Sequence, residues 1–517
     1  MSTKRTFGTL AAIGGATAVV ALLCSVPNAR ADELSDLRVN NELLQQRLDQ
    51  LAQAAQMGPG ERMYQNMATQ KPAPTIAGSF PRSFLIPGTD TSIRVGGNIT
   101  LITDTFLEGG VANGSPWNTT IGANGAVNSI GVGTTSNAKG SNDWGFSARQ
   151  SQLIVETRTP TPYGEARSYL SLDFANSTAY NPGGSGPAAI ADNLTPRMKY
   201  AYGTLGGWLA GQANSNFEDP DANAETIDFG GNVGEPGRVR VAQIRYTMPL
   251  NWAWGGALSF SAENPEVEAL TSGGICGSDA GIPSACTTGT VTGNPTKPSA
   301  PDFTAALYIP QPWGHIDIGG VLRPAMGLSD GKYLSRSYTG GGGAISFDVK
   351  PGWLTPKDDI LFHFVAGDGL GAYLNNFGNA AIETNYSALT TGATGGACVA
   401  AGPAGATTAN CVRSKLIQEI GGEIGYQHWW ASNLRSTFSF GINEQNGVKS
   451  SYLTAAAAAA ASRRIETAHA NLLWNPVPFV TVGVEYMWGQ RWAVAVPTGT
   501  PDSNQIQTII GKFDVAF

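Results

Sequence analysis

"TIIGKFDVAF", residues 508–517, ends the sequence with a strict alternation of side chains. Successive side chains of a β-strand point to opposite faces, so Phe513 and Phe517 share one face while Lys512 and Asp514 share the other. Chain termini of soluble domains are usually poorly ordered. A strand whose apolar face continues to a final phenylalanine therefore predicts contact with lipid rather than a frayed end in water.

The same two-residue alternation recurs along most of the chain after residue 91. Within 479–489, for example, Val482, Val484 and Tyr486 share one face, and Glu485 lies on the other. This pattern predicts sixteen strands, at 92–106, 143–158, 165–175, 195–205, 207–217, 237–248, 253–263, 302–310, 314–323, 333–349, 358–370, 413–428, 434–443, 463–474, 479–489 and 504–517. Each has an apolar face suited to lipid and a polar face suited to water.

The connections between these segments alternate between long and short. A transmembrane β-barrel has tight turns on its periplasmic side and long loops outside, whereas a soluble sandwich has no reason to gather its long loops at one end. Tryptophan, which favours membrane interfaces, lies at or beside the short turns: Trp208, Trp252, Trp254, Trp313, Trp353, Trp429, Trp430 and Trp474. We therefore predict an all-β fold, a 16-stranded antiparallel transmembrane β-barrel whose lumen is wide enough for water.

Composition excludes several other classes of protein. Charged residues make up 14% of the chain, below the roughly 25% of soluble domains, and glycine accounts for 66 of 517 residues. The net charge of −7 gives no basic surface for nucleic acid. The four histidines are scattered and no nucleophile motif accompanies them, so we predict neither an enzyme nor a cofactor.

The N-terminal region reads as targeting and assembly segments. Residues 1–31 have a basic start, a short apolar run and a small-residue cleavage site, which predicts a signal peptide rather than a membrane anchor. Residues 32–57 carry about three heptads, which predicts a periplasmic α-helical coiled coil; an amphipathic helix packed on the barrel is the alternative. We expect a linker at 58–91 and the barrel at 92–517.

Four cysteines follow the targeting segment, all in glycine-, alanine- and threonine-rich stretches. They form two local pairs, Cys276 with Cys286 and Cys398 with Cys411. Since exported proteins meet an oxidising compartment, we expect two loop disulfides. Zinc ligation is the alternative, although no CxxC motif or histidine cluster supports it.

Basic side chains fall repeatedly on the inferred lumen face. They are Arg94, Arg167, Arg197, Lys199, Arg245, Arg323 and Arg435. The third long loop is acidic and contains Glu218, Asp219 and Asp221. If that loop folds inward, its carboxylates face the basic wall and the opposed charges filter ions across the lumen. The alternative is that the arginines are salt-bridged wall supports and the acids lie on a solvated loop.

Three stretches resemble the DcaP-like family of outer-membrane porins. "SFPRSFLIPGTDTSIRVGGNITL" (79–101) is similar to the entry into that family's first strand, and "ARQSQLIVETRTPTPYGEARSYLSLDF" (148–174) to its second and third strands. "GQANSNFEDPDANAETIDFGG" (211–231) resembles the strand that leads into its third loop. The resemblance implies a trimer of sixteen-stranded barrels, a periplasmic coiled coil and a preference for small anions such as dicarboxylates. Gln152 departs from the arginine that related porins often have there.

We accordingly expect a passive porin of the bacterial outer membrane that admits small hydrophilic solutes and favours anionic ones. Its expected partners are outer-membrane lipid, two further copies of itself and the barrel-assembly machinery, for which Phe517 resembles the recognition signal. The alternatives are a structural or adhesive barrel with a blocked lumen, or a porin that is non-selective or prefers cations.

Overall fold

The computed structural model describes residues 77–109, 132, 144–175, 196–237, 240–251, 255–266, 268–272, 297–329, 335–352, 355–375, 380–385, 413–448, 458–459 and 461–517. The predicted signal peptide, coiled coil and cysteines lie outside these residues, as does most of the linker. Within the described chain, no helix is long and apolar enough to cross a membrane.

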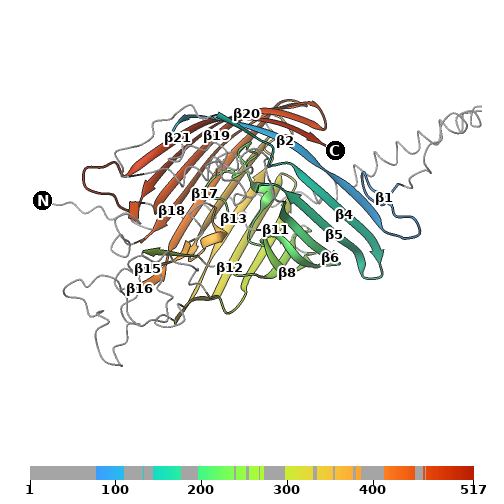
Figure 1. The fold of residues 1–517 in the computed structure, drawn as a ribbon. Helices are drawn as coiled ribbons and strands as arrows, with labels where there is room; N and C mark the ends of the chain where they lie inside the picture. Colours follow the sequence, from blue (N-terminus) through green and yellow to red (C-terminus); the bar gives the residue numbers. More distant parts are fainter. Residues whose placement is uncertain are drawn as a thin grey trace, which may run out of the picture.

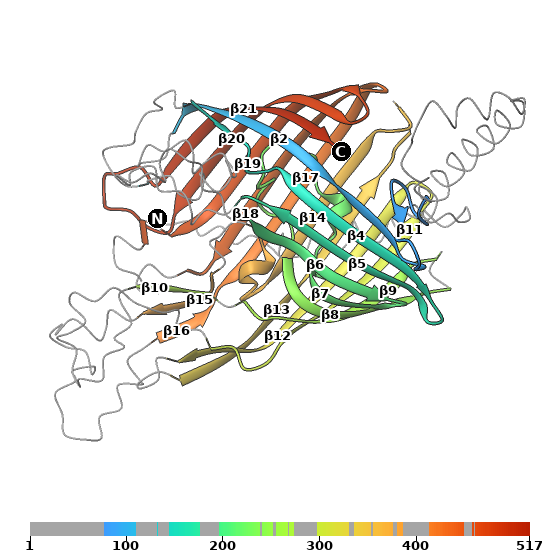
Figure 2. The same ribbon diagram turned by 45° about the vertical axis from the view of Figure 1, so that its right-hand side comes forward.

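The described strands form a closed antiparallel barrel of sixteen strands (Figures 1 and 2). The main sheet also includes the two-residue β1 (Phe84–Leu85) and divides one barrel strand into β3 and β4. The barrel strands are β2 (Ser92–Glu108), β3 (Trp144–Ser147) with β4 (Gln152–Thr161), β5 (Gly164–Asp173), β6 (Arg197–Leu205), β7 (Trp208–Asn214), β8 (Arg240–Pro249), β9 (Ala257–Glu263), β11 (Asp302–Gln311), β12 (Gly314–Ser329), β13 (Ser335–Val349), β14 (Asp359–Asp368), β17 (Gln418–Ala431), β18 (Leu434–Asn446), β19 (Ser462–Val477), β20 (Val480–Ala493) and β21 (Ser503–Ala516).

The barrel closes where the last strand pairs with the first, as the sequence predicts. β21 pairs with β2 from Ala516 opposite Asn98 onward, and Figure 2 shows β2 between β21 and β4. The backbone of Phe517 adds two hydrogen bonds with Gly97. Closure matters because an open strand edge in hydrocarbon leaves backbone polar groups unsatisfied.

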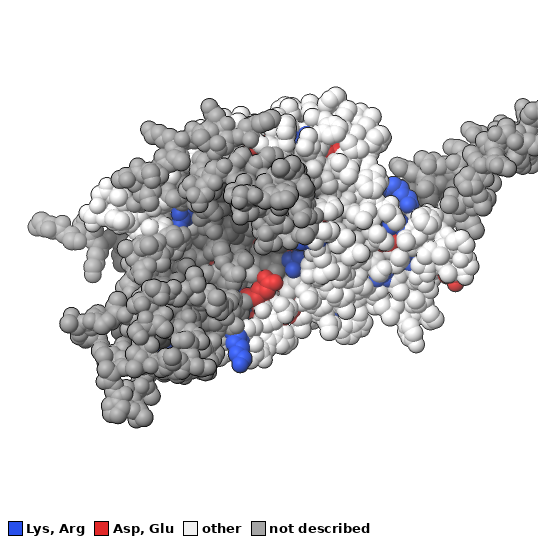
Figure 3. Space-filling view, viewed as in Figure 1, with Lys and Arg blue, Asp and Glu red and all other residues white. Residues whose placement is uncertain are grey.

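The alternation of side chains between the two faces is also as predicted. Large apolar residues on the outer face are exposed, among them Ile99 at 59% and Ile424 at 53%. Their inward neighbours Thr100 and Glu423 are buried. On the face that Figure 3 shows, charged atoms are sparse over the described wall. A charged side chain at the bilayer midplane costs roughly 2–4 kcal/mol, so this outer surface suits lipid.

Several elements differ from the predicted pattern. The second predicted strand, 143–158, is broken, because residues 148–151 leave the ladder and the Ser151 hydroxyl contacts the backbone of Thr100. Part of the predicted linker is ordered, since β1 pairs with the start of β2. Two long loops contribute β10 (Glu268–Ser272) and β15 (Ala380–Asn385) to a three-stranded sheet with β16 (Arg413–Leu416). β16 takes the first residues of the predicted strand 413–428, so the barrel strand there begins only at β17.

An apolar core lies inside the barrel, where the alternation alone predicts water. Inward wall residues such as Ile510 and Met487 are at most 2% exposed. They belong to one buried cluster with Phe217, Ile227 and Leu374, which come from connections between strands. Each such side chain contributes about 1.5–3 kcal/mol when it is fully buried. The interior is therefore partly filled by folded-in chain.

The turn between β13 and β14 carries a testable carboxylate. Asp358 has no exposed side-chain surface and accepts hydrogen bonds from the Thr355 hydroxyl at 2.6 Å, the Tyr426 hydroxyl at 2.9 Å and the Trp429 amide at 3.1 Å. His428 Nδ1 lies 3.0 Å from it. Burial raises the pKa of Asp358, but these hydrogen bonds outweigh burial and hold its pKa below the ordinary value.

We expect Asp358→Leu to lower the melting temperature of the detergent-solubilised barrel at neutral pH, because it leaves buried donors unsatisfied at a cost on the order of 1–3 kcal/mol. A lowered pKa stabilises the fold above the unfolded carboxyl's pKa, and that contribution is lost as pH falls through the folded pKa. The gap between variant and wild type should thus narrow in strong acid. The exposed Asp90 provides the control Asp90→Leu, and equal melting temperatures for all three proteins would contradict this role.

Candidate channel constriction

The connection between β7 and β8 folds into the barrel. We call residues 215–237 of this connection the inward loop. It leaves the wall beside β9, runs along the inner faces of β12, β17, β18 and β20, and then returns toward β8. This is the acidic third loop, and its inward course is the one that the charge argument requires.

Three buried glutamates from separate strands hold the inward loop by its backbone. Glu263 accepts the Asn216 amide at 2.9 Å, and Glu423 accepts the Ala224 amide at 3.2 Å. Each of the three, Glu485 included, is at most 2% exposed. A buried carboxylate is stable only when it is paired or well hydrogen-bonded, so the loop and the three glutamates require one another.

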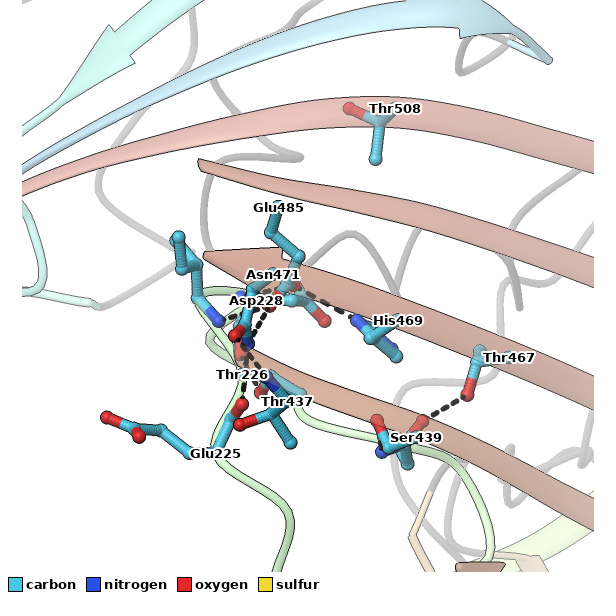
Figure 4. Close-up of polar contacts among 12 residues, drawn as sticks. Glu225, Thr226, Asp228, Thr437, Ser439, Thr467, His469, Asn471, Glu485 and Thr508 are labelled. Carbon is cyan, nitrogen blue, oxygen red and sulfur yellow. Dashed lines mark hydrogen bonds and ion pairs between the residues drawn. The ribbon is translucent and has the colours of Figure 1, made fainter. Parts of the chain in front are cut away.

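Glu485 has four partners, from the inward loop and from β19 (Figure 4). It accepts the amides of Ile227 and Asp228 at 2.6 and 3.0 Å. Asn471 donates to it at 3.1 Å, and His469 Nδ1 lies 3.0 Å away. Strands β19 and β20 of the wall therefore orient the carboxylate that binds the amides of Ile227 and Asp228 in the inward loop.

Glycines on the wall make room for the inward loop. A methyl group at Gly441 would lie 2.1 Å from the carbonyl oxygen of Val233, and one at Gly425 would lie 2.9 Å from the Ala224 side chain. Added methyl groups would also lie within 3.3 Å of inward-loop atoms at Gly319, Gly421 and Gly483. Some of the chain's many glycines therefore lie where the inward loop contacts the wall.

The acids of the inward loop occupy different settings. Asp219 is buried 2.8 Å from His315 Nε2. Glu225 accepts hydrogen bonds from Nε and Nη2 of Arg435 at 2.6 and 2.5 Å. Asp221 is exposed, and Glu218 is half-buried. The wall thus pairs with Asp219 and Glu225 of the loop, and the Asp221 side chain is exposed.

The opposite wall carries a cluster of guanidinium groups. Buried Glu156 on β4 accepts hydrogen bonds from Arg94 at 2.6 Å and from Arg158 and Arg167 at 2.8 Å each. Between 25% and 31% of each arginine side chain is exposed. Beside the turn between β4 and β5, Glu165 lies 3.5 Å from Arg158. Two carboxylates face three arginines, which leaves a positive surplus in contact with water.

The other predicted basic residues extend this wall. Arg197 forms a two-point pair with Asp173 at 2.8 and 2.6 Å and lies 5.5 Å from the ring of the loop residue Phe229. Lys199 lies 5.9 Å from the Tyr200 ring. Arg245 donates to Gln243 and to the carbonyl of Asn214, the last residue of β7.

Arg323 has a different setting from the other predicted lumen residues. Its side chain is fully buried and donates to Asp302 at 3.0 Å, to the carbonyls of Gly369 and Leu370 at 2.8 and 2.9 Å, and to the carbonyl of Glu266. It therefore ties two long loops to the wall instead of facing the water-filled lumen.

Several residues of this site are absent from the sequence-based set. Arg158 follows its partner Glu156 by two residues on β4, so the two side chains share a face. Strand alternation could therefore have identified Arg158. Glu263, Glu423 and Glu485 also lie on inward faces, but no local signal indicates that they bind loop amides. Among the described residues, no group of histidine, cysteine and acidic side chains could hold a metal ion.

Comparison with known proteins shows a matching family and a solved structure of similar fold. A family model described as "Porin subfamily" matches residues 69–508. The solved outer membrane channel DcaP of Acinetobacter baumannii is similar in fold, with a TM-score of 0.59 and 20% identity over 86% of this chain and 100% of that chain. An anion-selective porin from Comamonas acidovorans gives a TM-score of 0.45 with 8% identity over 83% of this chain and 100% of its own. No curated protein matches the sequence.

The family match covers most of the chain, and the DcaP channel is similar to it in fold. These findings confirm the resemblance that the three sequence stretches carry. The family and the barrel together point to the bacterial outer membrane. This chain belongs to the porin family.

Proposed function

We propose that this porin is a passive channel for small hydrophilic solutes and that it favours anions, dicarboxylates among them. The observation that carries the anion preference is the cluster of Arg94, Arg158 and Arg167 around the single buried carboxylate of Glu156. Arginine's planar fork suits carboxylates. With the inward loop opposite, a solute passes between this basic wall and the exposed Asp221, so opposed charges orient it.

The proposed assembly is a homotrimer in outer-membrane lipid, exported by the signal peptide of residues 1–31. The helix of residues 32–57 would then lie in the periplasm as a coiled coil. Local disulfides join Cys276 to Cys286 and Cys398 to Cys411, and Phe517 serves as the signal for the barrel-assembly machinery. The resemblance of residues 79–101, 148–174 and 211–231 to the DcaP-like family supports the trimer.

The test is current through the purified protein in a planar bilayer under a salt gradient. We expect stepwise conductance and a reversal potential of the anion-preferring sign. Steps with the opposite sign would contradict the anion preference alone. An absence of steps, together with liposomes that do not swell in sugars or dicarboxylates, would contradict the channel and favour a barrel with a blocked lumen.

A further inference from the structure

A second connection also enters the barrel and contacts the inward loop. Residues 369–375, between β14 and β15, form what we call the bracing segment. Its apolar side chains are deeply buried, with Leu370 and Leu374 at 0% exposure and Tyr373 at 3%. The Tyr373 ring packs edge-on against Phe217 of the inward loop, with ring centroids 5.8 Å apart. The two connections therefore share one packed interior.

The bracing segment pairs with the returning limb of the inward loop as a short antiparallel ladder. The Gly237 amide donates to the Tyr373 carbonyl at 2.7 Å, and the Asn375 amide donates to the Glu235 carbonyl at 3.1 Å. Pro236 and Leu374 face each other between these bonds. Proline is tolerated there because its position in the ladder requires no amide hydrogen.

Asn375 makes the contact that reaches furthest into the inward loop. Its side-chain amide donates to the carbonyls of Gly230 at 3.1 Å and Asn232 at 2.8 Å. Its own carbonyl accepts the Asn443 side chain of β18 at 2.8 Å. One residue thus joins the turn of the inward loop, its returning limb and the barrel wall.

The bracing segment is itself fixed to the wall on three sides. The Gly371 amide donates to Glu419 at 2.8 Å, and the Tyr373 hydroxyl donates to Glu263 at 3.0 Å. Arg323 donates to the carbonyls of Gly369 and Leu370. Because Glu263 also holds the first residues of the inward loop, both limbs of that loop depend on this segment.

We propose that the constriction of this channel consists of two loops, with residues 369–375 fixing the inward loop and Asn375 as its positioning residue. This inference rests on the proposed channel function. The bracing segment keeps the returning limb against the wall, so the open pore has one steady width. Without it, the limb fluctuates into the lumen, and the current becomes noisy and closes at lower voltage.

The first test is Asn375→Asp in the purified full-length protein. The substitution keeps the shape but replaces the amide donor by a carboxylate facing two carbonyls. We expect open-channel noise to rise severalfold and the voltage of closure to fall. Asn446→Asp adds the same charge at an exposed position at the end of β18 and should behave as wild type. If the two variants show the same open-channel noise and close at the same voltage, the proposal is overturned. If the wild-type protein conducts no current, the channel function itself is overturned.

The second test does not depend on how Asn375→Asp folds. Residues that face each other between two ladder bonds lie close enough for a disulfide. We therefore expect Pro236→Cys with Leu374→Cys to cross-link on oxidation, and the oxidised channel to resist closure at voltages that close its reduced form. Wild-type protein with and without the same reductant controls for the native cysteines. Identical closure in both forms of the double variant would overturn the proposal.

Discussion

Replacing Arg94 and Arg167 together by glutamine should remove most of the channel's anion preference and move the reversal potential toward the cation side. The double variant leaves Arg158 paired with Glu156 at 2.8 Å, so the buried carboxylate keeps a partner and the barrel should still fold. A unit charge near the passage is worth on the order of 1 kcal/mol to a passing ion, even at high dielectric. Each lost arginine should therefore lower the anion-to-cation permeability ratio severalfold.

The control for this pair is Lys357→Gln, which removes a positive charge from an exposed residue in the turn between β13 and β14. That residue lies over the Trp429 ring, and its loss should change selectivity little. Measurement at low and high salt adds a second check, since screening weakens exposed charges. If Lys357→Gln and Arg167→Gln shift the reversal potential equally, the cluster around Glu156 does not set selectivity.

The fold follows from sequence because its signal is local and repeated. Each barrel strand alternates side chains between lipid and interior, so residues such as Phe513 and Asp514 are assigned to opposite faces without knowledge of their neighbours. The seam follows as well, since a barrel in lipid must close. The break at residues 148–151 is missed because the flanking residues still alternate.

The interior is harder to predict because its contacts join residues far apart in the sequence. Glu485 has the alternation of a lumen residue, yet its carboxylate is enclosed by amides of Ile227 and Asp228. Arg323 likewise has the correct strand parity and ends fully buried under two loops. The alternation along a strand determines whether a side chain points into the barrel. Whether that side chain then meets water or packed chain depends on which loops fold inward.

The three-stranded sheet of β10, β15 and β16 shows the same limit. β10 and β15 belong to different long loops and pair in parallel, and β16 completes the sheet. β10 and β15 have five and six residues, which is too few for an alternation to stand out. β16 lies within the predicted strand 413–428, but it is separate from the barrel strand β17 and pairs with β15 instead. Pairing between two distant loops supplies the stability that no single segment has.

The inward loop provides the second large effect. Gly441→Ala should displace the loop, because the new methyl group would lie 2.1 Å from the Val233 carbonyl oxygen and 2.9 Å from the Asn232 side chain. Contacts this short do not occur at real Cβ atoms, so the backbone must move. Overpacking of this kind typically costs about 1–3 kcal/mol. The shift carries Asn232 away from Glu423 and Ser439, which it contacts at 2.8 and 2.7 Å. We expect a clear change in single-channel conductance, read from step size in symmetric salt.

Gly320→Ala is the matched control, because the nearest heavy atom to its added methyl group would be 4.0 Å away. Both variants add one methyl group to a glycine in a barrel strand, so a general effect of alanine on strand formation would appear in both. Both should run as folded, heat-modifiable barrels on gels. Wild-type step size in Gly441→Ala would mean that the inward loop yields without narrowing or widening the passage, and the constriction would then have to be set elsewhere along the lumen.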